Sequence, residues 1–178
     1  QAIVLDALCE LNESLRGDPT NRVNNFYADN GAPREENACR DQMLIALGAL
    51  PYSITYLPEV AAPQTKRCDA AFSYGNFRVP LEAKRQWHRD LWNAASSQLD
   101  LLYASDHAAD GKGIYVVFWF GPNMAGGRRM PRHPKGESAP TTPQELEAML
   151  QALLPTGRDS DITIMVLDCT RPKKASKK

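Results

Sequence analysis

Hydrophobic positions divide the first part of the chain into two helical segments and a polar connection. Apolar side chains recur at every third or fourth position in residues 2–16. The same spacing extends from about Pro33 to Leu50, with a stripe that starts at Cys39. Both patterns predict amphipathic helices. Pro33 suits the first turn of the second helix, where no N–H is needed.

The next part of the chain has strand patterns. Residues 53–57, "SITYL", predict a short strand, and two clearer strands are expected at 66–74 and 77–85. Gly75-Asn76 between them is a typical two-residue hairpin turn. Residues 113–121, "GIYVVFWFG", are continuously apolar, which favours a fully buried strand.

Three further elements complete the order along the chain. A helix is expected at 89–104, a second at 143–154, and a final strand in "DITIMVLDC", residues 161–169. One face of the 89–104 helix is apolar, with Trp92, Ala95, Leu99 and Leu102. The order α, α, β, β, β, α, β, α, β predicts one α/β domain whose sheet is flanked by helices.

Length and composition agree with one domain that has its own core. The chain has 178 residues and a net charge of zero, and no apolar run approaches the roughly 18 residues that cross a membrane. Its four cysteines form no CxxC pair, so reduced thiols are expected rather than a zinc site or disulfides. No targeting sequence is recognisable, and a cytoplasmic protein, or a fragment of a longer one, is expected.

Charge is distributed unevenly. Residues 126–136 hold four Lys or Arg and residues 171–178 hold five, with no acid in either stretch, whereas the other 159 residues carry 12 bases and 21 acids. Two basic segments on an acidic body suggest arms that touch polyanions, although solvated segments without a partner have the same composition.

The hairpin places two acids side by side. With Gly75-Asn76 as the turn, paired residues have numbers that sum to 151, so Asp69 lies opposite Glu82 and shares its face with Lys84. Facing like charges destabilise a sheet, but a hard cation such as Mg²⁺ binds them readily. The alternative is a surface charge ladder in which Lys84 and Arg67 neutralise the acids.

The second helix contributes another acid. Its apolar stripe is centred near the direction of Glu36, while Glu35 points about 75° away, by the helical period of 100° per residue. An acid in the first turn is favoured by the helix dipole, but the dipole does not require an inward direction.

These residues together resemble the PD-(D/E)xK nuclease superfamily. The similar features are a helix with an inward Glu, a hairpin with Asp and then E-x-K ("LEAK", 81–84), and a following helix and strand, over roughly residues 33–120. By this resemblance, Glu36 matches the helix acid, Asp69 the motif aspartate, and Glu82 with Lys84 the E-x-K pair. Cys68 stands where some members have proline.

The resemblance implies a restriction-endonuclease-like α-β-β-β-α-β core with an extra N-terminal helix and a C-terminal α-β. Its expected parts are an N-terminal helix and loop (1–32), the catalytic core (33–120), a basic flexible loop (121–142), a C-terminal helix and strand (143–170) and a basic tail (171–178).

The implied activity is Mg²⁺-dependent endodeoxyribonuclease cleavage, with Mn²⁺ able to replace Mg²⁺. Asp69, Glu82 and the Ala83 carbonyl would hold the metal, Glu36 would complete the site, and Lys84 would position the attacking water. Some members of the superfamily carry a Gln on the following helix, a position that Gln98 matches.

The expected partner is nucleic acid, DNA rather than RNA, bound through backbone phosphates by the basic segments. A bacterial defence or restriction effector, acting as a homodimer or with further domains upstream, fits this activity. The leading alternative is a catalytically inactive module that binds nucleic acid or a protein partner on the same fold. A glycoside hydrolase with two carboxylates is less well supported, because only Trp87 near this hairpin could stack on a sugar.

Overall fold

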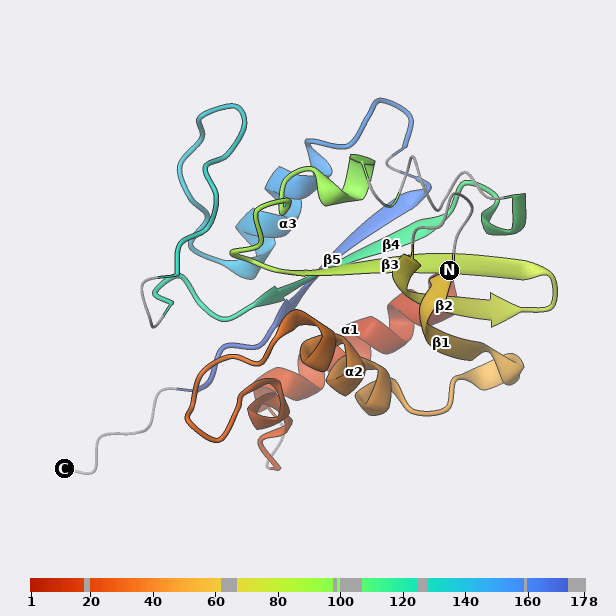
Figure 1. Cartoon of the computed structure of the whole chain (residues 1–178), viewed down its shortest axis with the longest axis horizontal. Helices are drawn as coiled ribbons and strands as arrows, with labels where there is room; N and C mark the ends of the chain where they lie inside the picture. The colour runs from red at the N-terminus through yellow and green to blue at the C-terminus, as the bar shows by residue number, and fades with distance from the viewer. Residues whose placement is uncertain are drawn as a thin grey trace.

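The computed structural model of the chain describes residues 1–17, 20–61, 67–97, 99, 107–124, 128–158 and 160–172 (Figure 1). At its centre is a five-stranded sheet of β1 (Thr55–Ala61), β2 (Arg67–Tyr74), β3 (Phe77–Arg85), β4 (Gly113–Trp119) and β5 (Ile162–Asp168). The strands lie side by side in that order. The first three form an antiparallel meander, and β3, β4 and β5 are parallel. The expected mixed α/β architecture is confirmed.

Helices cover both faces of this sheet (Figure 1). α1 (Ala2–Gly17) and α2 (Glu36–Leu47) pack on one face, and α3 (Pro143–Gln151) packs on the other. In the described part of the chain, the connections contain the short 3-10 helices η1 (Arg22–Phe26), η2 (Pro51–Ser53) and η5 (His107–Ala109). Within the described ranges, no helix has both the length and the apolar character needed to cross a bilayer.

Apolar periodicity explains why these elements form. In α1 the buried residues are spaced three or four apart, as a helix with one face on a sheet requires: Val4, Leu8, Leu11 and Leu15. Every residue of β4 is buried, because this strand lies between β3 and β5 with helices on both faces. A continuous apolar run is the pattern expected of such a strand.

The hairpin has the register that its turn predicts. Pairs run from Ala70–Leu81 to Tyr74–Phe77, and Gly75 has a positive φ of 56° in the turn. Pro80 is tolerated in β3 because the pairing of β3 with β4 begins only at Leu81. At Pro80 the strand therefore has a neighbour on one side, and its missing N–H breaks no ladder.

Two predicted helices differ from the structure. α2 begins at Glu36 rather than near Pro33, because an antiparallel bridge to Tyr27 holds Pro33 in extended backbone. It also ends at Leu47 rather than Leu50. In the predicted 89–104 helix, residues 89–93 form turns, and among the described residues only 94–97 and 99 are helical. The expected stripe is nevertheless buried at Trp92, Ala95 and Leu99.

Candidate active site

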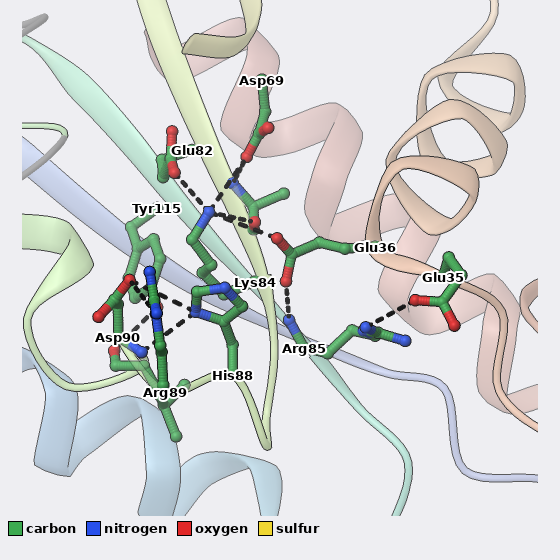
Figure 2. A network of polar contacts seen from close by, with 12 residues as sticks. Glu35, Glu36, Asp69, Glu82, Lys84, Arg85, His88, Arg89, Asp90 and Tyr115 are labelled. Atoms are coloured by element: carbon green, nitrogen blue, oxygen red, sulfur yellow. Dashed lines mark hydrogen bonds and ion pairs between the residues drawn. The ribbon is translucent and has the colours of Figure 1, made fainter. Parts of the chain in front are cut away.

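Four oxygen atoms surround the ammonium group of Lys84 (Figure 2). Its Nζ lies 2.5 Å from Glu82 Oε1 and 3.5 Å from Glu36 Oε1. Asp69 Oδ2 is 3.6 Å away, and the carbonyl oxygen of Ala83 is 3.2 Å away. The fold thus brings Glu36, Asp69, Glu82, Ala83 and Lys84 together, as the sequence pattern predicts. They come from α2, β2 and β3.

Asp69 lies where β2 and β3 separate. The ladder between these strands ends at Ala70–Leu81, so the predicted pairing of Asp69 with Glu82 is wrong, although the other pairs follow the predicted register. Instead, Asp69 Oδ2 accepts a hydrogen bond of 2.8 Å from the backbone N–H of Ala83. The carboxylate replaces a backbone acceptor here, as short polar side chains often do at the end of regular structure. This bond fixes the orientation of the Asp69 carboxylate toward Lys84.

Glu36 and Glu35 have different environments although they are adjacent. The side chain of Glu36 is 18% exposed, and its Oε2 accepts a 3.0 Å hydrogen bond from the backbone N–H of Arg85. The side chain of Glu35 is 80% exposed and pairs with the Arg85 guanidinium at 2.9 Å. The inward direction of Glu36 is the one that the helical period predicts.

Burial and charge act against each other at this site. Burial, followed by repulsion from Asp69, raises the pKa of Glu82 to about 7, although the ammonium of Lys84 acts in the opposite direction. Burial alone would lower the pKa of Lys84, but Glu82, Asp69 and Glu36 together outweigh it and raise that pKa. The site is therefore arranged to hold a positive charge.

The ammonium of Lys84 does not neutralise all of the negative charge at this site. When ionised, the three carboxylates carry a charge of −3 against +1 on Lys84, the cation that pairs with all three among the described residues. Glu82 Oε2 is buried without a hydrogen-bond partner there. Tyr115, its neighbour in the β3–β4 register, donates its hydroxyl proton to the Leu91 carbonyl instead. An unpaired acceptor beside excess negative charge favours a second cation.

The donor set fits a hard divalent ion. Carboxylate and carbonyl oxygens are the protein ligands that Mg²⁺ takes, with waters completing its octahedron. In the part of the chain that is described, no group of three His, Cys, Asp or Glu side chains is arranged to hold a metal as it stands. The ammonium of Lys84 occupies the centre of the four oxygens, so a metal ion bound there requires Lys84 to move.

Comparison with known families places this site in a wider group. A family model described as "Domain of unknown function (DUF8371)" matches residues 19–122. The chain belongs to the DUF8371 family. The match covers α2 and β1 to β4, and so the DUF8371 region contains every residue that surrounds Lys84. Comparison with curated proteins and with solved structures gave no match.

Some residues of the DUF8371 site were not predicted. Arg85 binds Glu36 through its backbone N–H and Glu35 through its guanidinium. In the sequence, its position next to Lys84 is all that could have indicated a role at the site. Tyr115 lies beside Glu82 on the neighbouring strand β4, and nothing in that apolar run of sequence distinguishes it from a core residue. Gln98, the expected flanking residue, lies outside the described residues.

Proposed function

We propose that this domain is a metal-dependent nuclease of the PD-(D/E)xK type that hydrolyses phosphodiester bonds in DNA. The single observation that carries the proposal is the convergence of Glu36, Asp69, Glu82 and the Ala83 carbonyl on one cation position. A structural ion pair needs one acid, whereas three carboxylates around one position fit a divalent ion and a phosphate.

The topology supports the same proposal. α2 precedes an antiparallel β1–β2–β3 meander, and β4 is parallel to β3. The helical residues between these strands, Ala94 and Ala95 among them, pack in the cluster that contains α3. This order agrees with the α-β-β-β-α-β plan that the resemblance implies.

The residues have distinct roles in the proposed reaction. When bound, Mg²⁺ would neutralise charge on the scissile phosphate and lower the pKa of the attacking water. Asp69 and Glu82 would hold the ion together with the Ala83 carbonyl, and Glu36 would bind it directly or through water. Lys84, displaced from the centre, would donate a hydrogen bond to the attacking water or to a phosphate oxygen. Ala83 N–H would keep the Asp69 carboxylate oriented throughout.

A second candidate is a module that binds nucleic acid without cutting it. The observation that favours it is Lys84 itself, which already supplies a positive charge at the centre of the carboxylates. In this alternative the cluster is a purely structural ion network, which joins α2 to the sheet.

Cleavage assays separate these candidates. Plasmid, single-stranded DNA and RNA are each incubated with Mg²⁺, Mn²⁺ or EDTA, and we expect DNA cleavage with either metal and none with EDTA. Asp69→Asn should abolish cleavage. The matched control is Asp161→Asn, because Asp161 pairs with Lys112 and Arg158 at 2.6 and 2.8 Å, outside this cluster. Full activity in Asp69→Asn would exclude the nuclease proposal, and cutting of RNA alone would change its substrate.

The setting of this activity stays a prediction. A cytoplasmic bacterial defence or restriction protein, acting as a dimer or with further domains, is what the resemblance suggests. Analytical ultracentrifugation with and without DNA tests the dimer.

A further inference from the structure

Three aromatic rings form a row beside the site, where β3, β4 and β5 end. Trp87 follows β3, Phe120 follows β4, and Tyr27 follows η1. The ring centroids of Trp87 and Phe120 are 5.3 Å apart, and those of Phe120 and Tyr27 are 5.4 Å apart. The Tyr27 hydroxyl donates to the carbonyl of Cys169, just after β5. In Figure 1 these segments meet at the left end of the molecule.

Arginine side chains lie against both ends of this row. The guanidinium carbons of Arg85 and Arg128 are 5.1 and 5.0 Å from the Trp87 centroid. At the other end, Arg171 lies 3.8 Å from the Tyr27 centroid. We name the row and these arginines, Arg85, Arg128 and Arg171, the arginine–aromatic strip. It begins one residue after Lys84 in sequence.

The strip has hydrogen-bond donors without acceptors. The Nε atoms of Arg85 and Arg171 are buried and have no partner among the described residues. The two Nη atoms of Arg85 are already used, one in a 3.2 Å hydrogen bond to the Arg34 carbonyl and the other in the pair with Glu35. In the described part of the chain, no acid pairs with Arg128 or Arg171. A guanidinium that lies over an aromatic ring is weakly hydrated, and those of its N–H groups that have no protein partner remain able to bind a phosphate.

We propose that the arginine–aromatic strip binds the phosphodiester backbone of a nucleic acid next to the bond to be cut. Its position beside the metal site rests on the proposed function, whereas its affinity for phosphates does not. The ring separations limit the strip to at most about 20 Å, the axial length of about six nucleotides of one DNA strand. Nucleic acid fits better than an acidic protein because every nucleotide of its backbone carries a phosphate, so that phosphates can lie at both ends of the strip at once.

The neighbouring basic residues provide matched controls. Arg129 and Arg132 belong to the same segment as Arg128 but are exposed, and no ring contact joins them to the strip among the described residues. If net charge alone determined binding, neutralising Arg129 and Arg132 would weaken it as much as neutralising Arg128 and Arg171. The strip predicts that Arg128 and Arg171 matter far more.

The test measures binding in EDTA, where no cleavage takes place. Fluorescence anisotropy is recorded with a labelled single strand and a labelled duplex of about 20 nucleotides, over a range of salt. We expect the double variant Arg128→Gln, Arg171→Gln to weaken binding at least about tenfold. The slope of log K against log salt should fall by up to about 1.8 for duplex and about 1.4 for single strand. Arg129→Gln with Arg132→Gln should change Kd less than about threefold.

A charge-preserving pair separates stacking from charge. Arg128→Lys with Arg171→Lys keeps both charges but loses the planar group, and should restore the salt slope but only part of the affinity. Equal losses in the strip and control pairs, or full recovery with lysine, would overturn the strip. Competition by polyglutamate as strong as that by nucleic acid would also overturn it.

The outcomes distinguish the strip from the nuclease activity. If plasmid is cut and the strip variants bind like wild type, the strip is wrong and the nuclease proposal stands. If the strip variants lose binding as expected but no substrate is cut with metal, the strip stands and the nuclease proposal fails.

Discussion

Replacement of Lys84 by methionine should strengthen metal binding while it abolishes cleavage. The ammonium of Lys84 now lies among the four oxygens that the metal needs, 2.5 Å from Glu82 Oε1 and 3.2 Å from the Ala83 carbonyl. Methionine has a similar length and no charge. Lys84→Met therefore removes the positive charge from among the oxygens, while the volume of the side chain changes little.

The size of the effect follows from the contacts. At an effective dielectric constant near 20, an ammonium and a divalent ion about 4 Å apart repel by about 8 kcal/mol, so they cannot share the four oxygens. In wild type the metal must first displace the ammonium from its short hydrogen bond to Glu82, and a hydrogen bond between charged groups contributes about 1.5–3 kcal/mol. Removing this cost should lower the metal Kd at least about tenfold, or about 1.4 kcal/mol.

Titration calorimetry with Mg²⁺, or loss of the free Mn²⁺ signal in paramagnetic resonance, measures this affinity without substrate. Lys112→Met is the matched control, because it also removes a lysine from an ion pair, with Asp161 at 2.6 Å, just before β4 begins. Its metal affinity should equal that of wild type. An unchanged or weaker affinity in folded Lys84→Met would refute the reasoning, because the four oxygens would then not be where the metal binds.

Three further predictions concern the acids of the site. Glu36→Gln should lower the cleavage rate at least about tenfold, and Glu35→Gln, at an exposed carboxylate, should change it little; single-turnover kinetics measure both. In EDTA, the raised pKa of Glu82 makes its contribution to folding full below about pH 4.5, and this contribution is lost as pH rises through about 7. Chemical unfolding should therefore show that the free energy of unfolding falls more from pH 5 to pH 8 in wild type than in Glu82→Gln, by up to about 3 kcal/mol. Asp69→Asn keeps an acceptor for the buried Ala83 N–H and should unfold at or above the wild-type midpoint, whereas Asp69→Ala should cost about 1–3 kcal/mol in the free energy of unfolding.

Local patterns predicted the parts of this fold that depend on local rules. The Gly75-Asn76 turn gives the hairpin register, and the helical period gives the inward direction of Glu36, because both follow from backbone geometry over a few residues. The predicted start of α2 was wrong because the bridge between Tyr27 and Pro33 overrides the preference of Pro33 for a first helical turn.

Contacts between distant segments could not be predicted in this way. Lys84 and Glu36 are separated by 48 residues, and the direction of a long flexible side chain is decided only by the charges around it. Where β2 and β3 separate at Asp69, a side-chain hydrogen bond replaces the next backbone bond of the ladder, and no pattern in the sequence indicates this exchange. The row of Trp87, Phe120 and Tyr27 needs the ends of three elements to meet, which no periodicity records.

The hydrogen bond from the Arg85 N–H to Glu36 Oε2 has a consequence for how opening of the site can be observed. Arg85 is the last residue of β3, and this bond connects the sheet layer to the first residue of α2. Its amide can exchange with deuterium only when the helix leaves the strand, so its exchange rate reports the separation of the two layers. Because Glu36 faces Lys84 through its other oxygen, a cation can be exchanged at that oxygen while the layers stay joined. Slow exchange of this one amide, with or without metal, is the expected signature of a site that loads its ion without opening the fold.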